Sequence, residues 1–284
     1  MGFVTRPGDH DTRGIVNPGA GFKRFTLTRH EPASDLAWAV DRYWAVRWNL
    51  PDGESYEQRV IPHPAVHLVF ETGTATIHAI SPHEFVRRLE SRGQGLGVKF
   101  RPAGFRPFLG GAVSAVAGRR LAASVVFGAE IDDIARALGQ DDDGDRSVAV
   151  VEAFLRSLGR HPLPMTATVN DVIALIVADD SLTRVDDLAR RLGMNTRKLQ
   201  RLFADHVGLG PKWVINRCRI HEAAEAATGG APIDWARLAA QLGYSDQSHL
   251  IRDFTAAVGT SPTRYTSRAA GAVDRRHSRL SPGA

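Results

Sequence analysis

The 284-residue sequence contains a single cysteine, Cys218, and no long run of apolar residues. One cysteine cannot build an internal disulfide framework or a cysteine-based zinc cluster within one chain, which fits a reducing compartment. No segment approaches the roughly 18 uninterrupted apolar residues that a membrane-spanning helix needs. Residues 1–10 also lack the apolar centre of a signal peptide. We therefore expect a cytoplasmic protein without a membrane partner.

A strong charge of one sign is also absent. The formal net charge is +5, which would suit a polyanionic partner. The small excess of Lys and Arg is spread almost evenly along the chain, so bulk charge does not separate a nucleic-acid-binding protein from an enzyme. The hydrophobic fraction of 43% is that of a globular protein, and the length suggests two domains.

The pattern along the chain predicts an α+β protein. Both ends, residues 1–20 and 269–284, are rich in Gly, Pro and charge, and we expect them to be flexible. Residues 21–160 are predicted to form a β-rich domain, either an open sheet or a barrel, that ends in helices and serves in sensing or dimerisation. The Pro-containing residues 161–168 form the predicted linker, and residues 169–268 are predicted to be all-α. Short apolar runs predict strands at 45–48, 66–70, 74–80 and 96–100, and apolar spacing predicts helices at 131–138 and 148–158.

One internal repeat lies in the helical part. Residues 188–211 match residues 238–262 at an offset of fifty that becomes fifty-one after one inserted residue. Each copy has a short helix with inward Leu and Ala, a Gly that can end it in left-handed geometry, and a second helix. This order is typical of a helix-turn-helix unit. The second helix would be capped by Asn195 or Thr196 in the first copy and by Ser245 or Asp246 in the second.

The second helix of each copy is predicted to pack on one face and to leave a polar face free. Arg can bond guanine and Gln adenine through two hydrogen bonds each in the major groove. The linking segment 211–227 contains no helix breaker after Pro211, so it could hold the two units rigidly apart, and two reading helices must lie about 34 Å apart to enter successive grooves. The polar faces contain Arg197, Gln200 and Arg201 in the first copy and Gln247, Ser248, His249 and Arg252 in the second.

Residues 170–266 resemble the carboxy-terminal domain of the AraC/XylS family of transcription regulators. The resemblance implies that the polar faces named above contact bases and phosphates of double-stranded DNA, that RNA polymerase is a partner if the protein activates, and that no cofactor, metal or catalytic residue is required. The β-rich half resembles sensor domains on one branch of this family, whose ligands are generally unknown. The matching residues include Leu188, Ala189, Gly193, Leu199, Phe203, Gly208, Pro211, Arg219, Ala223, Ala239, Gly243, Tyr244, Leu250, Phe254, Gly259, Pro262 and Tyr265.

Several residues have both a functional and a purely structural interpretation. Trp44, His67 and Phe100 are candidates for an effector site, although aromatic residues of a small β domain usually form its core. His63, His67, His78 and His83 could include metal ligands, although strand alternation and nearby prolines explain their spacing equally. Cys218 lies between two arginines and could be a redox sensor or an ordinary helix position.

We expect a sequence-specific DNA-binding transcription regulator, not an enzyme, that is modulated by a small-molecule effector or by homodimer formation. Two other classes stay open at this point. One is a metal-dependent cupin-like enzyme fused to a DNA-binding module. The other is an interaction module, or a plain helical bundle, in which the repeated units serve only structure. The sequence contains no Gly-rich phosphate loop, nucleophile elbow or pair of carboxylates in a helical setting.

Overall fold

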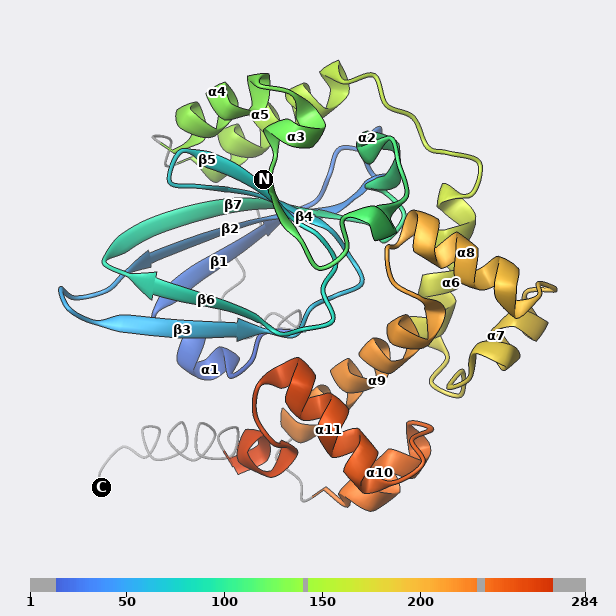
Figure 1. Ribbon diagram of the computed structural model, residues 1–284. Coiled ribbons are helices and arrows are strands. Elements are labelled where there is room, and N and C mark those ends of the chain that lie inside the picture. The colour runs from blue at the N-terminus through green and yellow to red at the C-terminus, as the bar shows by residue number, and fades with distance from the viewer. Residues whose placement is uncertain (1–13, 140–142, 229–232, 268–284) are drawn as a thin grey trace, which may run out of the picture.

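The structure is a computed structural model that describes residues 14–139, 143–228 and 233–267. Strands fill the first half of the chain and helices the second (Figure 1), which confirms the predicted α+β class. The strands are β1 (Phe25–His30), β2 (Val40–Asn49), β3 (Ser55–Val60), β4 (His67–Glu71), β5 (Thr74–His78), β6 (Phe85–Glu90), β7 (Arg92–Phe100) and β8 (Arg120–Ala122).

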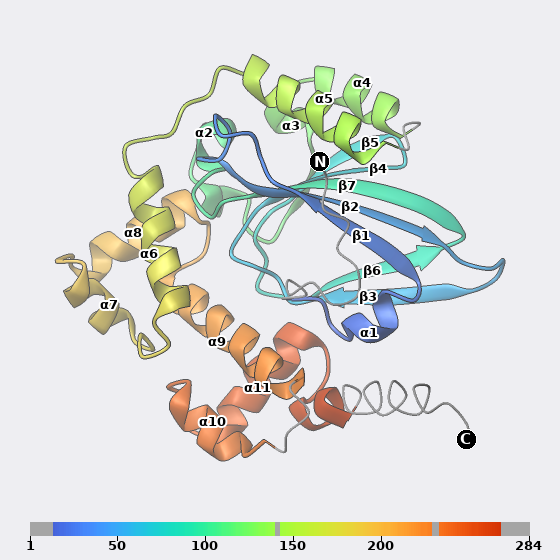
Figure 2. The same cartoon turned by 180° about the vertical axis from the view of Figure 1, so that it is seen from behind.

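Six of these strands form one antiparallel sheet in the order β1-β2-β7-β4-β5-β8, and β3 pairs with β6 separately. Helices cover one face of the six-stranded sheet, and the β3–β6 pair lies on its other side (Figures 1 and 2). The helices of this β-rich domain are α1 (Pro18–Gly21), α2 (Arg106–Leu109), α3 (Ser124–Phe127), α4 (Glu130–Leu138), α5 (Gly144–Ser157) and the 3₁₀ helix η1 (Val113–Ala115).

The two faces of the sheet differ in chemistry because side chains alternate along each strand. The face under the helices is apolar and holds Tyr43, Leu68, Val98 and Phe100, all fully buried. Aromatic contacts extend this core from Phe100 to α2, where Phe108 lies 5.5 Å away between ring centroids. The opposite face carries Trp and charged side chains instead. Only one face of the sheet therefore forms the core of the β-rich domain.

The helical domain is built around one long helix, α9, which runs between the two groups of shorter helices (Figure 1). Its first half packs Val214 and Ile215 into one apolar cluster, and its second half packs Ala223 and Ala227 into another. The helices of this domain are α6 (Thr166–Ala178), α7 (Val185–Arg191), α8 (Thr196–His206), α9 (Pro211–Thr228), α10 (Trp235–Gln241) and α11 (Gln247–Val258). Among the described residues, no helix is both long and apolar enough to cross a membrane.

The start of the chain differs from the sequence expectation at residues 14–20. Ile15 bridges Val60 of β3, and the Val16 amide donates to the Arg59 carbonyl at 3.0 Å. Val16 is buried in the same apolar cluster as the second half of α9. These contacts are made to residues far away in the sequence, so local composition carried no sign of them. Residues 1–13 and the predicted tail 269–284 lie outside the described residues.

Candidate DNA-binding surface

The two repeated units have the same turn between their helices. In the first unit the Gly193 amide donates to the Arg190 carbonyl at 3.1 Å, and the next amide donates to the Ala189 carbonyl at 2.9 Å. In the second unit Gly243 donates to the Ala240 carbonyl at 3.1 Å, and the next amide donates to the Ala239 carbonyl at 2.9 Å. Both glycines have positive φ, 61° and 73°, a conformation that side chains with a Cβ disfavour. The repeat seen in the sequence is thus a repeat in backbone geometry.

The second helix of each unit begins at a side-chain cap. Asn195 Oδ1 accepts from the Lys198 amide at 2.8 Å at the start of α8. Asp246 Oδ1 accepts from the His249 amide at 2.8 Å at the start of α11. The hydrogen bond from that amide holds the pKa of Asp246 below its usual value. Of the two residues considered for each cap, the structure therefore selects Asn195 and Asp246, which fix where each helix starts and which side chains face outward.

One face of α8 and one face of α11 are packed in the helical domain. Leu199 and Phe203 of α8 are fully buried, as are Leu250 and Phe254 of α11. The Phe254 ring meets Tyr265 edge to face, with 5.5 Å between ring centroids. Burying these large side chains is what holds each helix against its unit. It also leaves the remaining face of each helix for contacts outside the domain.

The predicted DNA-contact residues lie on those outward faces. Six of the seven are exposed, and His249 is half-buried. The His249 ring sits edge to face against Tyr244, and its Nδ1 lies 3.3 Å from Ser245 Oγ. Its position is therefore set by neighbours within the second unit. The six exposed residues are Arg197, Gln200, Arg201, Gln247, Ser248 and Arg252.

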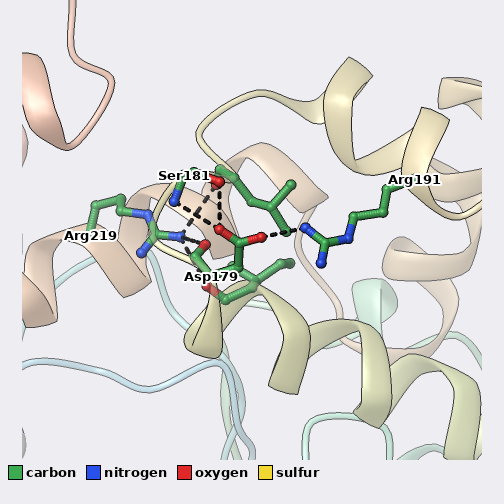
Figure 3. Close-up of polar contacts among 6 residues, drawn as sticks. Asp179, Ser181, Arg191 and Arg219 are labelled. Carbon is green, nitrogen blue, oxygen red and sulfur yellow. Dashed lines mark hydrogen bonds and ion pairs between the residues drawn. The ribbon is translucent and has the colours of Figure 1, made fainter.

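Arg219 of α9 ties the first unit to the linking helix (Figure 3). Its guanidinium is almost fully buried and donates to the carbonyls of Ile176 at 2.9 Å, Asp179 at 2.8 Å and Leu182 at 3.4 Å. Asp179 in turn accepts from Ser181 Oγ at 2.5 Å and pairs with Arg191 of α7. These two contacts hold the pKa of the Asp179 carboxyl below its usual value, with the Ser181 hydrogen bond the larger cause. The end of α6, the start of the loop to α7, and α9 thus form one hydrogen-bonded unit.

The β-rich domain contacts α9 directly. Arg217 Nη2 donates to the Pro82 carbonyl at 2.7 Å, and its guanidinium lies 4.8 Å from the centre of the Trp213 ring. Burial lowers the pKa of Arg217 to about 10. One turn further along, the His221 ring stacks on His63 with 4.3 Å between centroids. The sequence did not predict these contacts, because a contact between domains has no periodicity that would reveal it.

Both helix-turn-helix units also touch the β-rich domain. In the first unit, Asp205 at the end of α8 pairs with Arg106 of α2 at 3.0 Å. In the second unit, Gly259 after α11 lies against the ion pair of Arg59 and Glu84, so closely that a Cβ there would come within 1.9 Å of Glu84 Oε2. The β-rich domain therefore contacts each unit as well as the helix between them.

The effector candidates from the sequence separate onto two faces of the sheet. Phe100 is fully buried in the core under the helices. Trp44 and His67 lie together on the opposite face, where Trp44 Nε1 donates to His67 Nδ1 at 3.3 Å. The sequence alone did not distinguish these positions, because the register of β2, β4 and β7 was unknown.

The four histidines considered as metal ligands do not form one group. His67 and His78 are cross-strand neighbours of β4 and β5, whereas His63 stacks on α9 and His83 is exposed in a loop. Within the ranges that the structure describes, no three His, Cys, Asp or Glu side chains are placed to hold a metal ion. Cys218 is buried in the apolar cluster shared by α6, α8 and α9.

An open groove of about 860 Å³ lies at the edge of the sheet where β1 begins, β2 ends and β7 begins. Its lining includes the aromatic side chains Phe22, Phe25 and Trp48 and the cationic side chains Lys23, Arg24, Arg47 and Arg92.

Comparison with known proteins agrees with the two-part architecture. Residues 188–268 match the family of a helix-turn-helix domain, and residues 28–122 match a domain of unknown function, DUF6597. A comparison with curated proteins finds no match.

Solved structures with similarity include AraC-type regulators. A transcriptional regulator with an AraC-type DNA-binding domain from Chromobacterium violaceum is 20% identical, with 35% of this chain and 88% of that chain covered and a TM-score of 0.32. An apo variant of ToxT from Vibrio cholerae is 13% identical over 87% of this chain and 98% of that chain, with a TM-score of 0.36. Wild-type ToxT with a bound unsaturated fatty acid is 12% identical over 87% and 96%, also with a TM-score of 0.36. Scores this low carry no argument about the present chain.

The repeated turns, the capped helices and the family match together define a DNA-binding helix-turn-helix protein. More particularly, a helix-turn-helix domain at residues 188–268 follows a DUF6597 domain at residues 28–122.

Proposed function

We propose that the protein regulates transcription by reading two successive major-groove segments of double-stranded DNA, one with α8 and one with α11. The observation that carries this proposal is the presence of two capped helices with equivalent turns, each with a packed apolar face and an exposed polar face. Arg201 and Arg252 occupy equivalent, exposed positions in the two units. Arg at such a position can bond the two major-groove acceptors of guanine.

The rigid connection between the units supports reading by both helices at once. Helix α9 is continuous through 18 residues, and Arg219 fixes it through three carbonyl groups to the end of α6 and the loop before α7, where Asp179 pairs with Arg191 of the first unit. A single chain with both units docked on one helix can therefore present two reading helices in a defined relation, as recognition of adjacent groove segments requires.

We further propose that the β-rich domain modulates DNA binding, either through a small molecule or through self-association. This part of the proposal is supported by the contacts of that domain with both units and with α9. A change in the β-rich domain that shifts Arg106, or the partners of Arg217 and Gly259, would bias the arrangement of the two units.

The decisive experiment is to select duplexes bound by the full chain from a random pool and to titrate the selected duplex with variants. Arg252→Ala should weaken binding to the selected site by roughly 5- to 150-fold and relax the base preference at one position, because a bidentate contact to one base is lost. Arg136→Ala removes the same charge from an exposed position on α4 of the β-rich domain and serves as the matched control. It should leave affinity and base preference unchanged.

Two outcomes would contradict this function. The chain would not be a DNA-reading protein if it retained no duplex from the pool even at low salt, where phosphate contacts are strongest. Equal effects of Arg252→Ala and Arg136→Ala would remove Arg252 from the contact set and favour a purely structural role for the second unit.

A further inference from the structure

The β-rich domain contains two sheets, and each of them contacts a different helix-turn-helix unit. The six-stranded sheet lies above the β3–β6 pair, and α11 lies below that pair (Figures 1 and 2). The loop of residues 79–84 connects β5 of the six-stranded sheet with β6 of the pair. Along this loop, the contacts with the helical domain change from the first unit to the second.

The start of the loop is held by the six-stranded sheet and packs on the first unit. The Ala79 amide donates to the Arg119 carbonyl at 3.0 Å, and the Gly118 amide donates to the Ile80 carbonyl at 2.7 Å. The Ile80 side chain is buried in the apolar cluster of α6, α8 and α9. A Cβ at Gly208, just after α8, would lie only 2.9 Å from Ile80 Cγ2. The six-stranded sheet therefore meets the first unit through a buried apolar contact.

Two polar contacts add to this connection. Arg106 of α2 pairs with Asp205 at the end of α8 at 3.0 Å. The Ala103 amide donates to Asn170 Oδ1 of α6 at 3.0 Å. Residue 103 and α2 follow β7 closely in the sequence, so both contacts are made by segments attached to the six-stranded sheet.

The end of the loop belongs to the β3–β6 pair and meets the second unit. Glu84 precedes β6 and accepts two hydrogen bonds from Arg59 Nη1 of β3, at 2.7 Å and 2.6 Å. Gly259, where α11 ends, lies against both side chains. A cation at this place suits the partial negative charge at the carboxyl end of a helix. Ile61, directly after β3, is buried in the apolar cluster that the second unit shares with α9.

The other end of the β3–β6 pair is anchored to the six-stranded sheet. Leu89 of β6 is buried together with Trp48 and Leu50, at the end of β2. Trp48 Nε1 donates to the carbonyl of Glu90, the last residue of β6, at 3.0 Å. Glu84 lies before the first residue of β6. The anchored end is therefore opposite to the end that contacts the second unit.

Between these two ends, more exposed side chains join the pair to the six-stranded sheet. Arg87 of β6 forms an ion pair with Glu71 of β4. The ring of Phe85 meets His78 of β5 edge to face, with 5.5 Å between ring centroids. Arg87 and Phe85 are both exposed, and ion pairs near the surface contribute little stability. A tilt of the pair about its anchored end would therefore meet little resistance there.

We propose that the β3–β6 pair positions the second helix-turn-helix unit while the six-stranded sheet positions the first, so that a tilt of the pair changes the relation between α8 and α11. The observation that carries this inference is the loop of residues 79–84, which touches one unit through Ile80 and the other through Glu84. The inference deepens the proposed function, because it names the part of the β-rich domain through which DNA binding is regulated. Only its consequence for DNA binding rests on that function.

The test is hydrogen exchange of the full chain without DNA, measured by mass spectrometry on peptides from α7–α8 and from α10–α11. Arg59→Met should speed exchange of the protected amides of α11 by roughly 2- to 5-fold, as expected for the loss of one ion pair, and should leave α8 unchanged. Glu84→Gln should have the same effect. Arg106→Met should do the reverse, with faster exchange in α8 and no change in α11.

Arg88→Met is the matched control for Arg59→Met. It removes the same charge from an exposed position of the same strand pair, where Arg88 pairs with Glu90, and it should leave both units unchanged. Equal acceleration of α8 and α11 in Arg59→Met would overturn the proposal, because the two units would then respond to the β-rich domain as one body. Unchanged exchange of α11 in both Arg59→Met and Glu84→Gln would overturn it as well.

A second measurement separates this inference from the proposed function. One base pair is inserted between the two segments of the selected duplex, and the resulting loss of affinity should be roughly 2- to 5-fold smaller for Arg59→Met than for the wild type. The expected exchange pattern with equal affinity losses would support the positioning of the second unit and remove its role in DNA reading. If the protein binds no DNA, the regulator proposal falls, whereas the exchange pattern still decides whether the β3–β6 pair positions the second unit.

Discussion

Acid should destabilise the β-rich domain through His67, and the structure gives the sign and the size of the effect. Burial lowers the pKa of His67 to about 3, with smaller contributions from the charges of Lys99, His78 and Arg42. In the unfolded chain the pKa of a histidine is about 6.5. Between these two values the unfolded state binds a proton that the folded state does not. The contribution of neutral His67 to the free energy of unfolding is therefore fully present above about pH 6.5 and is lost as the pH falls towards 3.

The expected magnitude follows from that difference in proton binding. Each pH unit between the two pKa values changes the free energy of unfolding by about 1.4 kcal/mol for one group. A fall from pH 7.5 to 4.5 should therefore remove about 2.7 kcal/mol through His67 alone. This is a large part of the roughly 5–15 kcal/mol that stabilises a typical protein. His78, whose pKa burial lowers to about 4, acts in the same direction but less strongly because its pKa is lowered by a smaller amount.

The assay is urea unfolding of the wild type and of His67→Gln at pH 7.5 and 4.5, with tryptophan fluorescence as the signal that reports unfolding. Glutamine can still accept the hydrogen bond of Trp44 but does not titrate in this range. The variant should lose about 2.7 kcal/mol less than the wild type between the two pH values. His161→Gln, at an exposed position between α5 and α6, should behave as the wild type. Equal losses for His67→Gln and the wild type would show that His67 is accessible to protons in the folded state, and the reasoning would fail.

Two further predictions concern the helical domain. Asn195→Ala and Asp246→Ala should each lower the free energy of unfolding by about 1 kcal/mol through loss of a helix cap, whereas Asn195→Asp should retain most of it; denaturant titration measures this, and no loss in either Ala variant would argue against the caps. Arg219→Met should destabilise by about 3 kcal/mol or more, because buried carbonyls and Glu222 lose their donor. Thermal unfolding measures this, with Arg237→Met, at an exposed position of α10, as the control. Equal melting temperatures for the two variants would contradict the prediction.

The helix-turn-helix units could be predicted from the sequence because their signals are local. A cap, a helix of fixed length and a turn glycine lie within about twenty residues of one another, and the chain repeats them. The caps are Asn195 and Asp246, each one of the two neighbouring residues that the pattern offered. The predicted contact residues follow from the same helix starts, because the start of a helix determines which side chains share a face.

The sheet was only partly predictable. The strands with apolar runs, β2, β4, β5 and β7, overlap the predicted segments. The β3–β6 pair was missed because neither strand contains a run of apolar residues longer than two, and five of the six residues of β6 are exposed. The register between strands is a long-range property, so the sequence placed Phe100 beside Trp44 and His67 as an effector candidate, although the sheet separates them. The contacts of Arg217 and His221 with the β-rich domain are also long-range.

The bonding of Arg219 makes the two halves of α9 unequal. Rotating α6 about this helix would leave a buried guanidinium without its three acceptors, whereas α9 meets the second unit through Ile220, Ala223 and Ala227 and through one hydrogen bond from Asn216 to Asp253. Methyl groups permit small sliding movements at little energetic penalty. If the two units read adjacent groove segments as proposed, we expect adjustment to the spacing of those segments to come from tilting of α10 and α11, while α7 and α8 keep a constant pose.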